Sequence, residues 1–189
     1  MNTVIKKNAA TLSRELKWLE QVIETRMNLY AGHPGAHADI FEINPPDLLE
    51  DDSFYAEVVK RDEMSFTERI ILLIALVPHI KPELFDPFLM PNKQTDRQFT
   101  EFGGDNHLLH SGFIPTGETA AFILTGGNLE KRLRLFALFC DDHFFHTRNI
   151  LKMEKSDPLA PYLSGTLKMS LEYLSYFTIG ISKFTSPAT

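Results

Sequence analysis

The residues that could perform chemistry are concentrated between Phe99 and Gly127, where the chain reads FTEFGGDNHLLHSGFIPTGETAAFILTGG. This stretch combines two glycine pairs, two histidines, several carboxylates and the start of a helix. Residues of these types can bind phosphate, hold a metal ion, or supply a nucleophile with its base. Each kind of chemistry has a required spacing, against which the stretch can be compared.

Phosphate binding would use Gly103-Gly104 or Gly126-Gly127. A P-loop has spaced glycines followed by Lys and Ser or Thr at the start of a helix. No Gly-Lys pair occurs in the sequence, and Gly126-Gly127 falls between two expected helices. We interpret this second pair as a helix C-cap followed by a tight turn. The chain alone is therefore expected to bind no nucleotide or other cofactor.

Metal binding would use two H-x-x-H pairs, His107 with His110 and His143 with His146, the second pair lying close to Cys140. Four such ligands could form a tetrahedral zinc site if the two segments met in the fold. The alternative is that the first pair lies in a loop and that the second packs around Phe144-Phe145. Packing is the preferred interpretation, and a His-rich zinc-binding protein is the third functional hypothesis.

Hydrolysis would need a nucleophile, a base and an orienting group, for which Ser111, His110 and either Glu118 or Asp105 are candidates. The G-x-S-x-G pattern of a nucleophile elbow is absent from the sequence. If Thr116 is a helix N-cap, Glu118 falls in the first turn, where its charge favours the helix dipole. We therefore expect no catalytic residues and no enzyme activity from this chain.

Binding to DNA would use a helix followed by a β-hairpin wing, as in a winged helix. The basic residues with this placement are Lys131, Arg132 and Arg134 on the helix and Arg148, Lys152 and Lys155 in or near the hairpin. Glu130 offsets the helical cations, and the chain carries a net charge of −6, which repels nucleic acid. DNA binding is therefore the second hypothesis and is not favoured.

The bulk composition predicts a soluble, cytoplasmic chain of one domain or two small ones. The 189 residues can bury a substantial core, and the single cysteine fits a reducing compartment. The basic N-terminus is not followed by the apolar run of a secretory signal. The longest apolar run, Ile70 to Val77, has eight residues, whereas a spanning helix needs roughly 20. No membrane partner is expected.

The N-terminal third is predicted to be helical. Apolar residues at three- and four-residue spacing predict a long amphipathic helix from Asn8 to Tyr30. An extended piece is expected at 40–43, and Ser53 can cap a short helix reaching about Arg61. Ser65 and Glu68 have capping-box spacing, which predicts a buried helix that Pro78 closes at Val77. Pro82 can then open a helix over 83–89.

The C-terminal part is predicted to contain three helices and a hairpin. Thr116 starts a helix that ends before Gly126, and Asn128 caps another through about Phe139. The apolar face expected for this second helix consists of Leu129, Leu133, Phe136 and Cys140. Strands over 149–154 and 165–169 form a hairpin, and a last helix covers 170–177. The predicted class is mainly α (α+β), winged-helix-like, with a small C-terminal β-hairpin, divided into a helical region 1–62, a winged-helix-like domain 63–179 and a tail 180–189.

The central stretch resembles the N-terminal, variant winged-helix domain of a family of bacterial AAA+ ATPases that is common in Bacteroidetes. The residues that carry the resemblance are Asp96, Arg97, Phe99-Thr100-Glu101-Phe102-Gly103-Gly104, His110-Ser111-Gly112-Phe113, Pro115-Thr116-Gly117-Glu118-Thr119, Phe122-Ile123-Leu124, Leu129-Glu130-Lys131-Arg132 and Asp142-His143-Phe144-Phe145. The flanking similarity extends over Leu16 to Tyr30, Ile40 to Leu48, Leu163-Ser164-Gly165 and Glu172-Tyr173-Leu174. The resemblance thus covers nearly the whole chain.

This resemblance implies a non-catalytic accessory domain that recognises a client protein or regulates an ATPase module. ATP and Mg²⁺ are then expected only in a module following the domain, and a hexameric ring only when that module is attached. The chain is either a fragment of a longer ATPase or a stand-alone copy. Two departures stand out: Thr95 and Gln98 replace Tyr and Gly, and Asp105 to Leu109 replaces a loop that usually contains Gly and Lys. A contact made by that loop is expected to differ here.

Overall fold

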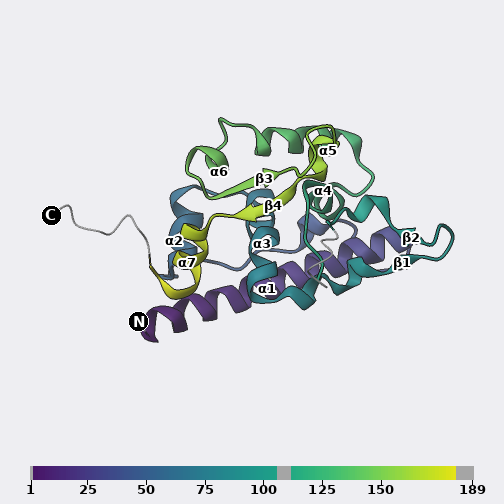
Figure 1. The fold of residues 1–189 in the computed structure, drawn as a ribbon. Helices are drawn as coiled ribbons and strands as arrows, with labels where there is room; N and C mark the ends of the chain where they lie inside the picture. The colour runs from purple at the N-terminus through teal and green to yellow at the C-terminus, as the bar shows by residue number, and fades with distance from the viewer. Residues whose placement is uncertain (1, 106–111, 182–189) are drawn as a thin grey trace.

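A computed structural model of the chain describes residues 2–105 and 112–181, which form a mainly helical molecule with two small antiparallel sheets (Figure 1). Its α-helices are α1 (Asn2–Ala31), α2 (Phe54–Arg61), α3 (Phe66–Ile80), α4 (Gly117–Thr125), α5 (Leu129–Leu135), α6 (Phe144–Thr147) and α7 (Leu171–Ile179). Its 3-10 helices are η1 (Ile40–Glu42), η2 (Pro82–Leu89), η3 (Thr100–Phe102), η4 (Phe136–Phe139) and η5 (Tyr162–Ser164). Its strands are β1 (Pro91–Asn92), β2 (Arg97–Gln98), β3 (Leu151–Glu154) and β4 (Thr166–Met169). The predicted mainly α class with a small β-hairpin is confirmed.

Helix α1 runs along one side of the molecule, with α7 beside its N-terminal half and the β1–β2 hairpin near its C-terminal end (Figure 1). Its buried stripe includes Leu19 and Val22, as the periodicity predicted. The helix begins at least six residues earlier than the predicted start at Asn8. Asn8 instead lies within it and donates a hydrogen bond of 3.1 Å from Nδ2 to the carbonyl of Tyr176 on α7. The contact with α7 thus stabilises the N-terminal part of α1, where the apolar pattern is weak.

Helix α3 is the centre of the core, since each residue from Arg69 to Val77 is buried. The predicted capping box is present, with the amide of Ser65 donating to Glu68 Oε2 at 2.7 Å. The prediction that the helix ends at Val77 is wrong, because it continues through Pro78 to Ile80. Val77 is fully buried, and its packing outweighs the preference of a residue before proline for extended geometry.

Two other local predictions are corrected. The segment expected to be extended at 40–43 contains η1, because Asp39 caps it by accepting the amide of Phe41 at 3.4 Å. This cap competes with strand geometry. The side chain of Ile40, the first residue of η1, is buried in the core. The segment 83–89 is helical as predicted, but it forms the 3-10 helix η2, which contains a second proline, Pro87.

The predicted hairpin is formed by β3 and β4, in a register that pairs Leu151 with Met169. A short extended segment before α4 joins the far edge of β4. The amide of Leu167 donates to the Pro115 carbonyl at 3.0 Å, and Thr116 forms an antiparallel bridge with Thr166. In space the extended segment, β4 and β3 lie in that order.

One cluster of buried apolar residues extends from α1 to α7. Helix α7 packs on both α1 and α2, where Tyr176 stacks on Phe54 with ring centroids 4.4 Å apart and Phe177 meets Tyr55. The division at 62/63 stays a prediction, as does the separation of the tail at 180. Within the described ranges, the helices are too short or too polar to cross a bilayer.

Candidate functional site

The first half of the central stretch packs into the core through aromatic side chains. Phe102 on η3 is buried, and its ring centroid lies 4.7 Å from that of Phe122 on α4 and 5.6 Å from that of Phe88 on η2. The neighbouring Glu101 accepts a hydrogen bond from the hydroxyl of Tyr30, at the end of α1. This bond raises the pKa of Tyr30 to about 12. The segment therefore ties the C-terminal end of α1 to α4.

The glycine pair at 103 and 104 packs against the start of α4 and lies in the left-handed half of backbone space, with φ of +63° and +91°. A Cβ on Gly103 would lie 2.5 Å from Thr116 Oγ1, and one on Gly104 would lie 2.5 Å from the ring of Phe113. The amide of Gly104 donates to Thr116 Oγ1 at 3.2 Å. The glycines thus allow close packing onto a helix start.

Thr116 is the N-cap of α4, as predicted, and its amide donates to Thr119 Oγ1 at 3.0 Å. Glu118 lies in the first turn, also as predicted, and accepts two hydrogen bonds of 2.6 and 2.7 Å from Arg132 on α5. The hydrogen bond from Glu118 raises the pKa of Arg132. Glu118 therefore joins α4 to α5. A Cβ on Gly117 would lie 2.5 Å from the sulfur of Met153, so that this glycine admits β3.

The remaining described motif residues lie on either side of positions 106–111, which the structure does not describe. Asp96 occupies the tight turn of the β1–β2 hairpin with a φ of +52°, and Arg97 pairs with Asn92. Asp105 and Ile114 are bridged by a hydrogen bond of 2.9 Å from the amide of Asp105. His107, His110 and Ser111 fall within 106–111, outside the described residues, as does most of the divergent loop. Gly112 and Phe99 are described, and Phe99 packs beside Phe102.

The two described histidines of the zinc hypothesis, His143 and His146, have separate partners. His143 caps α6, accepting the amide of Phe145 on Nδ1 at 3.2 Å, while its Nε2 lies 3.0 Å from Glu68 Oε1. His146 is exposed, and its Nδ1 lies 3.2 Å from the carbonyl of Asp141. Across residues 2–105 and 112–181, no three His, Cys, Asp or Glu side chains gather in a way that could hold a metal ion. The four-histidine hypothesis thus depends on residues outside the description.

The basic residues proposed for DNA binding have acidic or carbonyl partners within the chain. On α5, Lys131 lies 3.0 Å from Asp39, Arg132 binds Glu118, and Arg134 binds Glu130. Around the hairpin, Arg148 binds Asp62, Lys152 lies 3.9 Å from Glu154, and Lys155 donates to the carbonyls of Pro158 and Ala160. These partners reduce the positive potential that DNA phosphates would meet.

The predicted apolar face of α5 lies largely at the surface. Leu129 and Leu133 are 67% and 62% exposed, and Cys140 is exposed as well. Phe136 is half-buried and stacks on Tyr162 of η5 with ring centroids 5.7 Å apart. Leu135, on the opposite side of the helix, makes the core contact. We call Leu129, Leu133, Phe136 and Tyr162 the apolar ridge. Such clustering of large exposed apolar side chains marks interaction surfaces.

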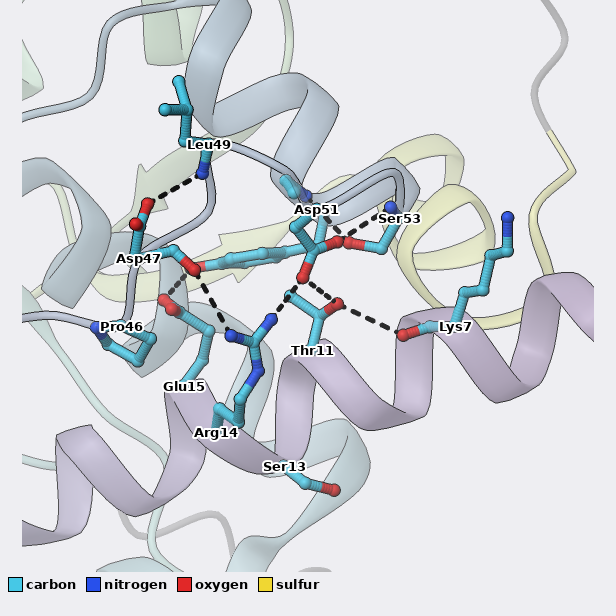
Figure 2. Close-up of polar contacts among 12 residues, drawn as sticks. Lys7, Thr11, Ser13, Arg14, Glu15, Pro46, Asp47, Leu49, Asp51 and Ser53 are labelled. Atoms are coloured by element: carbon cyan, nitrogen blue, oxygen red, sulfur yellow. Dashed lines mark hydrogen bonds and ion pairs between the residues drawn. The ribbon is translucent and has the colours of Figure 1, made fainter.

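A polar cluster between α1 and the segment before α2 was not predicted (Figure 2). Asp51 accepts hydrogen bonds from Thr11 at 2.7 Å and from the amide of Ser53 at 2.8 Å, and it is also bound by Arg14. Deeper in the core, Glu15 accepts the hydroxyl of Tyr55 at 2.9 Å.

Arg69 of α3 binds Glu15 and also donates to the Pro46 carbonyl at 3.0 Å. Burial raises the pKa of Glu15, and Arg69 opposes the rise. The one signal in the sequence was a carboxylate beside the apolar stripe of α1. This cluster fixes α1 against α3 and the segment before α2, and Nε of Arg69 is buried in it without a hydrogen-bond partner.

The chain matches no family model, no curated protein and no solved structure.

Proposed function

We propose that this chain is a non-catalytic accessory domain of an AAA+ ATPase, which uses α5 to bind a protein. The bound protein is either a client or the ATPase module itself. The motif resemblance supplies the link to the ATPases. The site supports a binding role because the motif residues that are described are occupied in packing and capping.

The order of elements supports a winged-helix interpretation. Helices α4 and α5 are joined by a short glycine turn, and the β3–β4 hairpin follows them after η4 and α6. In a helix-turn-helix the second helix is the recognition helix, which corresponds here to α5. The extended segment at Pro115-Thr116 contacts β4 through an isolated antiparallel bridge, at the position where a winged helix has its third strand.

The observation that carries the proposed function is the character of α5. A recognition helix for DNA exposes unpaired cations and polar groups to phosphates and base edges. Helix α5 instead exposes Leu129 and Leu133, while two of its three cations, Lys131 and Arg132, are bound by carboxylates of other elements. Covering exposed apolar area of this kind with a bound protein lowers the free energy of the system.

Site-specific photo-crosslinking in cells tests this role. A benzophenone amino acid is placed at Leu133, on the ridge, and at Leu171, which is 79% exposed on α7 and serves as the matched control. We expect a cross-linked protein from position 133 and not from 171, either carrying Walker motifs or serving as a substrate of such a protein. Cross-linking to nucleic acid, or identical products from both positions, would contradict the proposal.

DNA binding by α5 and the hairpin is the second candidate, favoured only by the order of elements. It predicts a complex with duplex DNA that weakens steeply as salt rises. Electrophoretic mobility shifts with a mixed-sequence duplex at low salt measure this. We expect no shift, because the relevant cations are paired within the chain and the net charge is −6.

A further inference from the structure

An apolar hollow of about 300 Å³ lies beside α5, on the flank away from Tyr162. Its walls include Phe41 of η1, Leu124 of α4, and Leu135 and Leu138 of α5 and η4. We call this space the α5 hollow. Its volume is at the lower end of the roughly 300–1,000 Å³ typical of ligand pockets. It therefore suits one or two inserted side chains better than a large cofactor.

Two lining residues of the α5 hollow belong to the buried core, and one wall is exposed. Leu124 and Leu135 are 1% and 3% exposed and belong to the core. Phe41, by contrast, is 40% exposed, and its ring lies 4.7 Å from that of Phe66 on α3. A preformed apolar surface of this kind binds an inserted side chain without ordering new protein segments.

The charged residues in the lining of the α5 hollow, Lys131 and Arg134, are both cations. Lys131 and Arg134 line it, with Lys131 Nζ 4.6 Å from the centre of the Phe41 ring. Asp39 is the carboxylate partner of Lys131, and Arg26 also acts on it electrostatically. Glu130 is the partner of Arg134, so that each lining cation has one carboxylate partner outside the lining. The two lining cations contrast with the chain's net charge of −6.

Arg134 is the cation most available to a partner. Its ion pair with Glu130 spans one helical turn, and the two side chains are 78% and 74% exposed. Pairs of this kind contribute little stability, so that exchanging Glu130 for a partner's carboxylate costs little. The guanidinium can also bind a carboxylate through two hydrogen bonds, which fixes the partner's orientation.

We infer that the α5 hollow binds an acidic protein segment that inserts a leucine or phenylalanine side chain and places a carboxylate on Arg134. The inference rests on the proposed binding of a protein by α5, and it adds a contact of stated chemistry on the flank of the helix opposite the ridge. The inserted side chain supplies apolar burial, and the two lining cations select acidic over basic sequences. The apolar ridge on the other flank of α5 lies outside this contact.

The test uses fluorescein-labelled twelve-residue peptides and fluorescence anisotropy with the whole chain. One peptide has a central Leu flanked by Glu residues, a second has Ala in place of Leu, and a third has Lys in place of Glu. We expect the acidic Leu peptide to bind at least about tenfold more tightly than the other two. We also expect its affinity to fall between 25 and 300 mM salt.

Two variants locate the bound peptide. Thr67 lines the hollow, and Thr67→Phe fills it while leaving the cations in place. Leu133→Asp changes only the ridge. We expect Thr67→Phe to weaken the acidic Leu peptide by about tenfold or more, and Arg134→Glu by severalfold, with Leu133→Asp within twofold. Circular dichroism of each variant verifies that it is folded.

The outcomes separate this inference from the proposed function. Equal binding of acidic and basic peptides, no binding of the acidic Leu peptide, or insensitivity to Thr67→Phe would overturn the inference. The crosslink from Leu133 would be unaffected by any of these results. Loss of binding in Leu133→Asp but not in Thr67→Phe would assign the peptide to the ridge, which overturns the α5 hollow and retains protein binding. A crosslink from Leu133 to nucleic acid would remove the proposed function itself.

Discussion

Glu15 and Arg69 place opposite charges inside the core, where their side chains are fully buried and 9% exposed. The guanidinium also lies over the ring of Trp18, 5.2 Å from its centre. Removing charges from water costs several kcal/mol per ion, and only a close partner with further hydrogen bonds offsets that cost. Tyr55 and the Pro46 carbonyl supply those bonds.

Replacing one member of this pair is expected to be much worse than replacing both. Arg69→Met leaves the Glu15 carboxylate buried without its cation and should lower the free energy of unfolding by about 3–5 kcal/mol. The double change with Glu15→Leu should recover most of that loss. Urea denaturation measures both. Arg134→Met, at an exposed pair, is the control and should change stability by less than about 1 kcal/mol. Equal losses in the single and double variants would refute this account.

Asp51 provides a prediction about pH. Burial tends to raise its pKa, but hydrogen bonds from Ser53 and Thr11 and the charge of Arg14 outweigh it, leaving the pKa below the ordinary 3.8. A carboxylate with a lowered folded-state pKa stabilises the protein above its unfolded pKa and loses that contribution as pH falls through the folded value.

Stability should therefore fall as the pH drops below about 4, and less so in Asp51→Asn. Urea midpoints at pH 7, 5 and 3 provide the comparison. A variant whose stability fell with pH as steeply as that of the original chain would show that Asp51 is not responsible.

Local spacing was enough to predict some residue roles. Thr116 and Glu118 lie where capping rules place them, because a cap and its helix are neighbours in sequence. The Glu15 cluster was missed because its partners Tyr55 and Arg69 are 40 and 54 residues away. A carboxylate beside an apolar stripe indicates burial only once the elements that cover it are known.

At the scale of elements, the close packing of the 99–104 segment on α4 depends on Gly103. Its backbone has a φ of +63°, and an added Cβ would lie 2.9 Å from the Thr119 amide nitrogen as well as close to Thr116. Gly103→Ala is expected to cost about 2 kcal/mol or more, from strain and displacement of the helix start. Gly127→Ala is the matched control, since nothing lies within 4 Å of its added Cβ. Thermal unfolding of both variants measures the difference, and equal melting temperatures would contradict the packing role.

The two sides of α5 should respond differently to mutation. Leu133→Asp changes a side chain that is 62% exposed and should alter stability by about 0.5 kcal/mol or less. Leu135→Ala removes a side chain that is 3% exposed and should cost about 2–5 kcal/mol. Guanidinium denaturation gives both values. A large loss from Leu133→Asp would mean that the ridge is part of the core.

The spacing of apolar residues does not predict where a helix ends or what covers its apolar face. The capping box of α3 is local and was predicted, whereas continuation through Pro78 depends on the burial of Val77 by distant segments. The Leu129, Leu133, Phe136 and Cys140 pattern is apolar at helical spacing, as expected. Periodicity identifies such a stripe but does not say whether the same chain or a second molecule covers it.

For the molecule as a whole, the continuous core predicts one cooperative unfolding transition. Trp18 is the single tryptophan and lies in the N-terminal region, 2% exposed, with its ring 5.0 Å from that of Phe66. Its fluorescence and the far-ultraviolet circular dichroism of all helices should give the same urea midpoint. Midpoints that differ would indicate that 1–62 and 63–179 unfold separately.

The overall class could be predicted because most helices and the hairpin have local signals in caps, prolines and alternation. Their arrangement could not. The pairing of Pro115-Thr116 with β4 joins segments about 50 residues apart, and its hydrogen bonds come from backbone atoms that every sequence carries. The contact between α7 and α1 joins opposite ends of the chain. It could not be predicted either, because no local spacing indicates it.

The exposure of Cys140 has a practical consequence. It is the one cysteine of the chain, and it follows the stripe of Leu129, Leu133 and Phe136 by one further helical step. A maleimide dye will therefore attach to the unaltered sequence at a single position near the end of the ridge. Its emission and rotational freedom can report the arrival of a partner, without any engineered handle and without first knowing what the partner is.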